Sequence, residues 1–586
     1  MLFSSLFSKT AEYEKLAHAL SAPGACALFG LPGSGRAMVY AALAKETGRF
    51  LCIVTPGEAE ATRFAGDLNA LGIPTAVFPA RDYVLRPIEG TAREYEYRRL
   101  SVLGDIVGGR LQAVCVPDEG LTQYTTPRAE FCNNTRTLHP GDTVPRTELT
   151  ALLYNAGYAR RAQVDGPGQF SIRGDIVDLY APDMKLPVRM EFWGDEIDTM
   201  HTFDLATQRR EDPIEKIYVS PAREVLFGSP AEAAELLRAF IKKFRGKKRT
   251  ALEACLATEL AQLDGGALPV NMDKYLAVRY PQPATLLDYF DDPLLVLEEP
   301  ASLREAERAT TYRRGEEISA LLQDGVLAAG LDNLYAEDGY LWAQTANHRT
   351  ICAENFARSM PDIPLKDIVN APAHTLPAWG GEVTSLLEDL QPLCNGGAAV
   401  TVLAGTQRAA AGLTADLRTK GLLVTTDPDA APGAGLVQVL PGQLSAGCSV
   451  PFAKYALFTA RAFGISSTQK KKKRNKDALN SLSEIAVGDL VVHQNHGIGR
   501  YAGIQRMAVQ GVTKDYLRIE YDKKDVLYVP VTQLDLLSRY TAPNDSDNVK
   551  LSRLGGSDWA KTRKKVKAAT EQMAKELIEL YACLLY

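Results

Sequence analysis

Short apolar runs alternate with polar, helix-compatible stretches in the first part of the chain. Between Cys26 and Pro117 the apolar runs are ACALFG, RFLCIVTP, PTAVFPA and LQAVCVP, and the stretch from Glu58 to Leu71 between two of them has the composition of a helix. Strands that alternate with helices are typical of βαβ units, which build parallel sheets covered by helices. We therefore predict a doubly wound parallel sheet in this region.

The pattern changes within residues 149–219, where closely spaced β signals appear. The segments QFSIRGDIVDLYAP and PVRMEFWGDEIDTMHTFD each contain a turn pair, Arg173-Gly174 in the first and Gly194-Asp195 in the second. Strand-like runs interrupted by such a pair are typical of a β-hairpin. We predict a small α+β domain inserted into the first domain.

Two further units and a final helix follow. AAVTVLAG at 398–405, the helix-compatible segment 406–420 and LLVTT at 422–426 predict a second, small α/β domain. Between residues 487 and 540 the runs DLVVHQ, GRYAGI, DYLRIEYD and VLYVPV predict a small, strongly bent β barrel. A long helix is predicted after Ser557, because apolar residues recur there at spacings of three, four and seven.

These patterns predict a multidomain α/β protein. The predicted segments are the first part of an α/β domain at 1–125, an inserted α+β domain at 126–215, the remainder of the first domain at 216–350, a small α/β domain at 366–465, a basic linker at 466–484, a β domain at 485–545 and a helix at 550–586.

Length and composition agree with several domains. The 586 residues, 46% hydrophobic and 23% charged, can bury more than one core. We expect neither a signal peptide nor a membrane span, and the cytoplasm is the expected location. The nine cysteines include no C-x-x-C pair, which predicts reduced thiols rather than a zinc ribbon or a disulfide framework.

The formal charge of −5 conceals two basic blocks, at 470–476 and 563–567. A polar run of like charge favours a solvated tether, and we interpret the first block in this way. Contact with the phosphates of duplex DNA is the alternative interpretation.

A glycine-rich loop, Gly30-Leu-Pro-Gly33-Ser-Gly35-Arg36-Ala37, lies between a predicted strand and a predicted helix. This is the context and spacing of a phosphate loop, G-x-x-x-x-G-K-[ST], in which the lysine contacts the phosphates and the hydroxyl holds magnesium. Arg36 replaces the lysine and Ala37 lacks the hydroxyl, so we expect no hydrolysis here. We interpret this as a degenerate P-loop whose glycines serve a tight turn, with residual nucleotide binding as the alternative. No catalytic residue is predicted.

Two sets of longer strings carry a resemblance to a known family. The first set is PIEGTAREYEYRRL at 87–100 and, within 168–198, GQFSIRGDIVDLYAP and RMEFWGDEID; the second is GDLVVHQNHGIGRYAGI at 488–504, DYLRIEY at 515–521 and LYVPV at 527–531. The first set resembles the UvrB homology module of the bacterial transcription-repair coupling factors (the Mfd family). The second resembles their RNA-polymerase-interacting domain, a CarD- or Tudor-like barrel. The chain is thus similar to the N-terminal, motor-less half of that family.

In the family the inserted domain binds UvrA through arginines and an aromatic side chain. The matching positions of this sequence are Arg160, Arg161, Arg173 and Tyr180. Both Arg160 and Arg161 are included because one residue separates two alignments. Arginine and tyrosine are frequent in interface hot spots. An ion pair of Arg173 with Asp175 or Asp178 is the alternative interpretation for that residue.

In the same family an edge strand of the CarD-like domain pairs with the β subunit of RNA polymerase. In such recognition the main-chain hydrogen bonds extend a sheet by one strand. The matching stretch is 504–511, and the residues implied are Ile504, Gln505, Arg506, Met507 and Val509. Met507 occupies the position of an apolar contact, and a place in the core is the alternative.

His493 and His496 have a spacing that can bind zinc. Because no Cys, Asp or Glu stands at a ligand spacing near them in the sequence, we interpret them as flanking a glycine turn. We expect no metal and no cofactor in this chain. ATP and Mg²⁺ are expected only for a motor that would lie beyond it.

The resemblance implies an adaptor in transcription-coupled nucleotide-excision repair, which binds stalled RNA polymerase through its β subunit and recruits UvrA. In the family an ATP-dependent translocase, which acts on duplex DNA, follows this half, and a C-terminal domain masks the UvrA-binding surface. We expect this shorter chain to expose that surface and to be no enzyme itself. The alternatives are a CarD-like transcription regulator and, less favoured, a UvrB-type helicase.

Overall fold

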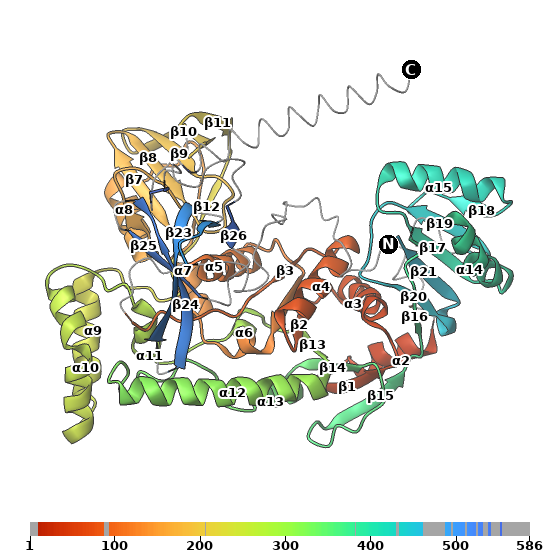
Figure 1. Cartoon of the computed structure of the whole chain (residues 1–586), viewed down its shortest axis with the longest axis horizontal. Helices are drawn as coiled ribbons and strands as arrows, with labels where there is room; N and C mark the ends of the chain where they lie inside the picture. The colour runs from red at the N-terminus through yellow and green to blue at the C-terminus, as the bar shows by residue number, and fades with distance from the viewer. Residues whose placement is uncertain are drawn as a thin grey trace.

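The structure is a computed structural model of the chain. It describes residues 7, 10–86, 93–205, 207–380, 382–428, 430, 433–460, 487–493, 496–509, 512–522, 525–530, 537–540, 551–553 and 559. A central α/β domain carries the inserted domain at one end and the small α/β domain at the other (Figure 1). The predicted linker at 466–484 and nearly all of the predicted helix at 550–586 lie outside the described residues.

The central domain contains a seven-stranded sheet, and all the strand pairs in it are parallel, which confirms the predicted parallel sheet. In spatial order the strands are β15 (Leu365–Asn370), β1 (Gly24–Phe29), β14 (Arg349–Glu354), β13 (Leu294–Glu298), β2 (Leu51–Thr55), β4 (Ala113–Pro117) and β3 (Thr75–Val77). Several strands are buried throughout, because helices cover both faces, and they therefore appear in the sequence as continuous apolar runs.

Three strands of this sheet come after the inserted domain in the sequence. The pairing of β15 with β1 places residues 365–370 in the central sheet rather than in the small α/β domain, so that predicted boundary was wrong. Strand β14 (349–354) likewise runs past the predicted end of the first domain, at residue 350. The helices of this domain are α2 (Ala11–Ala19), α3 (Gly33–Thr47), α4 (Glu58–Ala70), α5 (Glu94–Val107), α6 (Asp118–Thr122), α12 (Pro300–Gln323) and α13 (Tyr340–Asn347).

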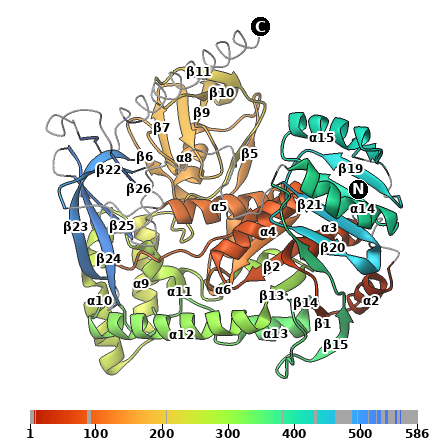
Figure 2. The same ribbon diagram turned by 45° about the vertical axis from the view of Figure 1, so that its right-hand side comes forward.

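The small α/β domain packs directly on helix α3 (Figure 2). One apolar cluster contains Met38 and Val39 of α3 together with Tyr455 and Leu457 of the small domain. Helix α3 is consequently buried from Ser34 to Ala44. The small domain contains β16 (His374–Leu376), α14 (Val383–Asn395), β17 (Ala399–Leu403), α15 (Gln407–Thr419), β18 (Leu423–Thr425), β19 (Leu436–Leu440), β20 (Gly447–Val450) and β21 (Tyr455–Thr459).

The inserted domain is a six-stranded sheet that is antiparallel except where β6 meets β7. The strands are β6 (Ala159–Arg160), β7 (Gln169–Arg173), β8 (Ile176–Tyr180), β9 (Val188–Trp193), β10 (Glu196–Phe203) and β11 (Arg210–Pro213). Both predicted hairpin turns are confirmed, between β7 and β8 and between β9 and β10. The domain also contains α7 (Arg128–Asn133), α8 (Arg146–Asn155), and the paired strands β5 (Arg136–Leu138) and β12 (Ile217–Val219).

A buried network of charges joins the inserted domain to the rest. Glu224, just past β12, forms ion pairs with Arg99 at 2.7 Å and with Arg81 at 3.1 Å. Arg81 also donates two hydrogen bonds to Asp273, at 2.7 and 2.9 Å. Asp273 belongs to a helical segment whose elements are α9 (Pro230–Lys242), α10 (Gly246–Asp264), η1 (Met272–Tyr275), α11 (Leu276–Arg279) and η2 (Leu286–Tyr289).

The last described strands form a five-stranded antiparallel sheet, called here the C-terminal sheet. In spatial order they are β25 (Val526–Pro530), β24 (Val512–Glu520), β23 (Gly497–Val509), β22 (Leu490–His493) and β26 (Leu537–Arg539). Among these described strands β25 and β26 do not pair, so the closed barrel stays a prediction. Within the described residues, no helix is both long enough and apolar enough to cross a membrane.

Candidate functional site

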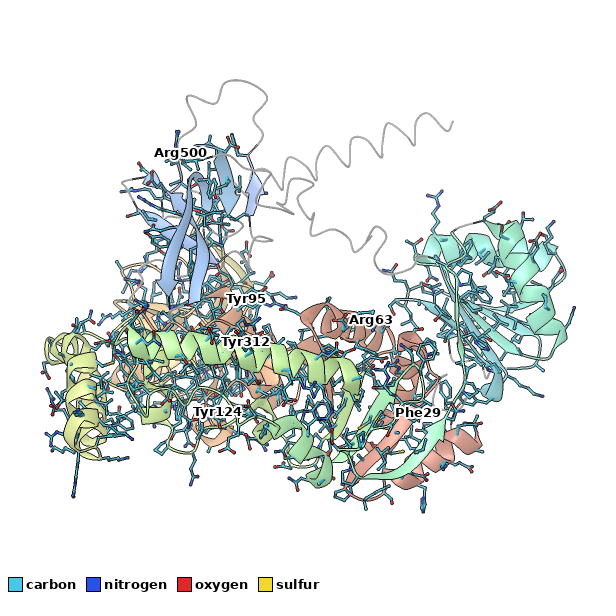
Figure 3. The ribbon with its side chains drawn as sticks, turned by 60° about the horizontal axis from the view of Figure 1, so that its bottom comes forward. Phe29, Arg63, Tyr95, Tyr124, Tyr312 and Arg500 are labelled. Carbon is cyan, nitrogen blue, oxygen red and sulfur yellow. The ribbon has the colours of Figure 1, made fainter. Side chains whose placement is uncertain are left out.

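The glycine-rich loop is short, because helix α3 begins at Gly33. Gly30 has a φ of 90°, a left-handed conformation that favours glycine, where the chain leaves β1. The main-chain amide of Arg36 donates to the carbonyl of Pro32 at 2.9 Å, so it already belongs to the helix. A Cβ on Gly33 would lie 2.5 Å from Nη1 of Arg63, a residue of α4 that is labelled in Figure 3. The start of α3 is therefore covered by a neighbouring side chain.

The Arg36 side chain occupies the space between the loop and the ends of β13 and β14. Its own exposed fraction is only 3%. The acceptors of its hydrogen bonds are the carboxylates of Glu298 and Glu299, the side-chain oxygen of Asn355, and the carbonyls of Leu31 and Ala353. All three nitrogen atoms of the guanidinium therefore have acceptors within the protein.

The charges around Arg36 balance inside the protein. Burial acts to lower the pKa of the guanidinium, but Glu298 and the other acidic neighbours outweigh it, and the pKa is raised. Burial raises the pKa of Glu298, and Arg36 and the hydroxyl of Tyr40 oppose that rise. We treat the pair as ionised, since arginine keeps its proton in proteins. A strand-end carboxylate that would help to hold magnesium in an active phosphate loop here faces an arginine instead.

The sequence analysis missed Glu298, Glu299 and Asn355. The first two could have been noticed, because they end the apolar run LLVLEE at 294–299, a pattern typical of a buried strand. Their contact with Arg36 depends on the order of strands in the sheet, which the sequence did not specify.

The four candidate residues of the inserted domain lie at two ends of strand β7. Arg160 pairs in register with Phe170, and Tyr180 pairs with Gln169, so both lie near the start of β7. Arg161 follows Arg160 and is exposed. Arg173 ends the strand, which places it about 13 Å away at ~3.3 Å per residue. The four residues do not form one compact cluster.

Arg173 forms the ion pair that was the alternative interpretation for it. Its Nη2 lies 2.6 Å from Oδ2 of Asp178, which is buried and is also bound by Arg189. The Arg173 side chain is nevertheless 46% exposed. The Arg173 side chain can therefore maintain its ion pair with Asp178 and still present part of its guanidinium to a partner.

Trp193 is an exposed aromatic residue that the sequence analysis did not select. It ends β9 at the hairpin turn, and its exposed fraction is 84%. Ile176 pairs with Glu191, so the turn after Arg173 and the turn after Trp193 lie at the same end of the sheet. An exposed tryptophan beside an arginine is typical of an interface.

Strand β23 has two neighbours along its first part and one along its second. Gly497 to Arg500 pair with β22, whereas Ile504 to Val509 pair only with β24 among the described strands. Ile504 is 44% exposed and Gln505 is exposed as well. The side chains of Arg506, Met507 and Val509 lie outside the described residues.

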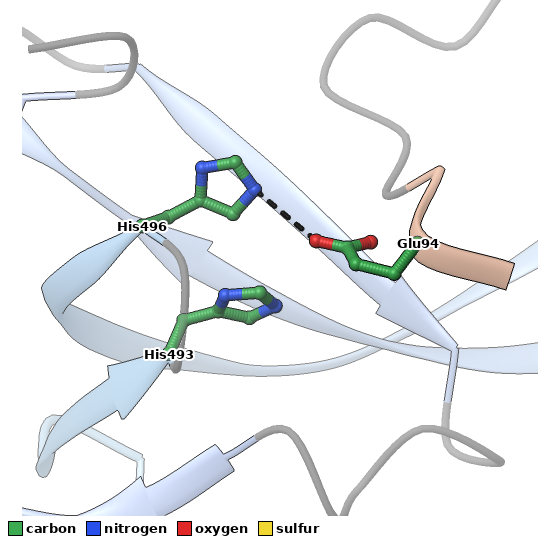
Figure 4. A group of neighbouring side chains, drawn as sticks. All are labelled: Glu94, His493 and His496. Atoms are coloured by element: carbon green, nitrogen blue, oxygen red, sulfur yellow. Dashed lines mark ion pairs between the residues drawn. The ribbon is translucent and has the colours of Figure 1, made fainter. Parts of the chain in front are cut away.

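An acidic residue from another domain, Glu94, lies beside His493 and His496, and Figure 4 marks its ion pair with His496. His493 ends β22, His496 precedes β23, and Glu94 lies in the first turn of α5. The ligand atoms of the three side chains lie within 4.8 Å of one another. Nε2 of His496 is 3.7 Å from Oε1 of Glu94, and the two imidazole ring centroids are 4.7 Å apart.

The three residues of this cluster differ in exposure. His493 is fully buried, whereas the Glu94 and His496 side chains are 19% and 31% exposed. Burial and the neighbouring His496 lower the pKa of His493 to about 4, with Glu94 opposing. Gly497 has a φ of 85°, and a Cβ there would lie 2.4 Å from Oγ of Ser552, so glycine is required beside His496.

Comparison with known proteins finds two matching family models. The UvrB interaction domain matches residues 137–225, and the CarD-like/TRCF RID domain matches residues 485–541. These matches cover the inserted domain and the C-terminal sheet, which carry the two sets of candidate interface residues.

Curated relatives match almost the whole chain and are named transcription-repair-coupling factor. The protein from Bacillus subtilis (strain 168) is 29% identical over 570 residues, which are 95% of this chain and 48% of that protein. The protein from Staphylococcus haemolyticus (strain JCSC1435) is 28% identical over 573 residues, with shares of 94% and 48%. The chain therefore spans about half the length of these relatives, and the resemblance inferred from the sequence is confirmed.

Proposed function

We propose, on the premise that this chain is similar to about half of the transcription-repair coupling factors, that it is an adaptor in transcription-coupled nucleotide-excision repair. It binds the β subunit of RNA polymerase through the C-terminal sheet and recruits UvrA through the inserted domain. The observation that carries this proposal is the presence of both domain matches in one chain.

The polymerase contact is assigned to the second half of β23. Main-chain groups along one side of Ile504 to Val509 are not used by another described strand, and such an edge can accept a strand from a partner. Ile504, at 44% exposure, supplies an apolar side chain beside this edge. Gln505, Arg506, Met507 and Val509 complete the proposed contact.

The UvrA contact is assigned to the β7 strand and its neighbours. Arg173 offers an exposed guanidinium on one end, and Arg160, Arg161 and Tyr180 flank the other. A surface of this length matches a protein partner better than a small ligand. Trp193 extends the proposed surface at the Arg173 end.

Nucleotide has no role in this half of the protein under the proposal. Arg36 occupies the loop region with its own acidic partners, and α3 is buried between two domains. ATP hydrolysis, magnesium and the translocation of duplex DNA belong to a motor segment that the relatives' greater length would accommodate. The cytoplasm is the proposed location.

The proposal is tested by two binding assays with single substitutions. Ile504→Arg places a charge at the edge of β23 and is expected to weaken binding of the purified β subunit at least tenfold, about 1.4 kcal/mol. Leu423→Arg is the matched control, because Leu423 is 71% exposed in the small α/β domain. Equal binding by wild type and Ile504→Arg would mean that the polymerase contact does not lie at this edge of β23.

UvrA binding is tested by Arg173→Glu, with Arg408→Glu on the exposed surface of α15 as control. We expect only the first substitution to weaken binding. A chain that binds the β subunit but never UvrA would favour the alternative of a CarD-like transcription regulator.

A further inference from the structure

We propose that Glu94, His493 and His496 form a binding site for one divalent transition-metal ion of the zinc class, which joins the C-terminal sheet to the central domain. This revises our expectation that the two histidines bind no metal. That expectation depended on the absence of a Cys, Asp or Glu at a ligand spacing in the sequence, and the fold brings in Glu94 from α5. The site does not depend on the proposed function.

The donor set selects the class of ion. Two imidazoles and one carboxylate are ligands that zinc and neighbouring transition metals accept, whereas magnesium and calcium prefer oxygen alone. Three protein ligands leave a fourth position of a tetrahedral ion for water or another donor.

The distances permit the ion after small side-chain rotations. The donor atoms of the three residues lie within 4.8 Å of one another. Two ligands of a tetrahedral ion, each at about 2.1 Å, are about 3.4 Å apart, so the most widely spaced donor atoms must move closer by about 1.4 Å at most. The positions of all three residues are fixed by their elements, since His493 ends a strand, Gly497 holds the turn after His496, and Glu94 begins a helix.

A simple ion pair explains less of this arrangement. It involves His496 and Glu94, which are 3.7 Å apart, and it needs a protonated histidine. It does not involve the buried His493 ring, whose centroid is 4.7 Å from that of His496.

The site would act as a clamp between domains. Glu94 belongs to the central domain, and both histidines belong to the C-terminal sheet. Asp165 of the inserted domain lies within electrostatic range of His496.

The test is a titration of the metal-free, full chain with Zn²⁺ in competition with a coloured chelator, and with Co²⁺ monitored by absorption. We expect one ion per chain and a Co²⁺ spectrum without a sulfur charge-transfer band, because the ligands are nitrogen and oxygen. Glu94→Gln and His496→Gln, both at partly exposed positions, should weaken binding on the order of 100-fold or more.

His139→Gln is the matched control, because His139 lies 3.5 Å from Asp142 in an exposed histidine–carboxylate pair. It should leave binding unchanged. His493→Gln changes a buried residue and can prevent folding. In that case the Glu94→Gln and His496→Gln variants decide whether the site binds metal. The absence of stoichiometric binding, a sulfur band in the Co²⁺ spectrum, or equal loss in the control would each overturn the proposal.

Discussion

The surroundings of Arg36 and those of His493 are alike in one way and opposite in another. In both, side chains from segments far apart in the sequence converge, within the central domain around Arg36 and between two domains around His493. Around Arg36 the protein supplies both the cation and its carboxylates, Glu298 and Glu299. Around His493 the three converging side chains are all possible electron-pair donors.

The difference explains which region is suited to a ligand. A buried arginine with satisfied donors and balanced charge offers nothing to an anion such as ATP. Two imidazoles beside a carboxylate instead have an affinity for a cation from solution. The balance of charge among converging side chains, rather than a local motif, decides whether a region is closed or open to ligands.

The largest effect is expected from Arg36→Met. Removal of the guanidinium leaves Glu298 buried with its charge uncompensated, and we expect a loss of roughly 3–5 kcal/mol in the free energy of unfolding of the central domain. Urea unfolding measures this change. Arg49→Met is the control, because the Arg49–Asp292 pair is 30% and 47% exposed and should contribute only about 0–1 kcal/mol. Similar losses in the free energy of unfolding for the two substitutions would contradict the account that the charges of Arg36 and its acidic partners balance inside the protein.

A double-mutant cycle sharpens this result. Glu298→Gln removes the carboxylate charge that Arg36→Met leaves behind, so the double variant should be more stable than the sum of the single changes predicts. The coupling energy should lie in the range of about 0.5–3 kcal/mol that contacting residues show. Strict additivity in the same urea assay would mean that the two side chains do not depend on each other.

Ligand-linked stabilisation compares the two regions directly. Zinc at 100 times its dissociation constant should stabilise the wild-type chain by about 2.7 kcal/mol, and Glu94→Gln should reduce that gain to about 0.4 kcal/mol or less at the same zinc concentration. ATP with magnesium should give no gain in either protein. Thermal unfolding with each ligand measures both, and stabilisation by ATP would show that the loop is open after all.

The smallest effect is expected where the sequence motif is restored. Arg36→Lys with Ala37→Thr recreates the phosphate-loop pattern, yet α3 still begins at Gly33, and Glu298 and Glu299 still surround the new lysine. We expect no binding of a fluorescent ATP analogue by this variant. Tight, magnesium-dependent binding of the analogue would show that the loop motif alone determines whether this region binds nucleotide.

Local pattern predicted the elements well where a strand or helix is defined by its own residues. The apolar runs of β1, β2 and β4 and the turn at Gly194 lie where expected, because burial on both faces and turn chemistry leave direct traces in sequence. The domain boundary at β15 was wrong because the partner of a parallel strand is set by tertiary packing.

The same distinction holds for the candidate sites: some residues could be selected from the sequence, whereas their contacts could not. Arg173 could be selected from a family motif, but its ion pair with Asp178 needed the register of the β7–β8 hairpin. The approach of Glu94 to His496 leaves no trace in local spacing, because it depends on how two domains pack. The polymerase and UvrA assignments remain predictions.

The adaptor proposal is tested most directly by a capture experiment with three components. RNA polymerase is immobilised, UvrA is added with or without the chain, and retained UvrA is measured. We predict that UvrA is retained only with the chain, and that either Ile504→Arg or Arg173→Glu removes it. Leu423→Arg is the control and should retain as much UvrA as the wild type. If the chain stays on the polymerase but no added UvrA is retained with it, the account is contradicted.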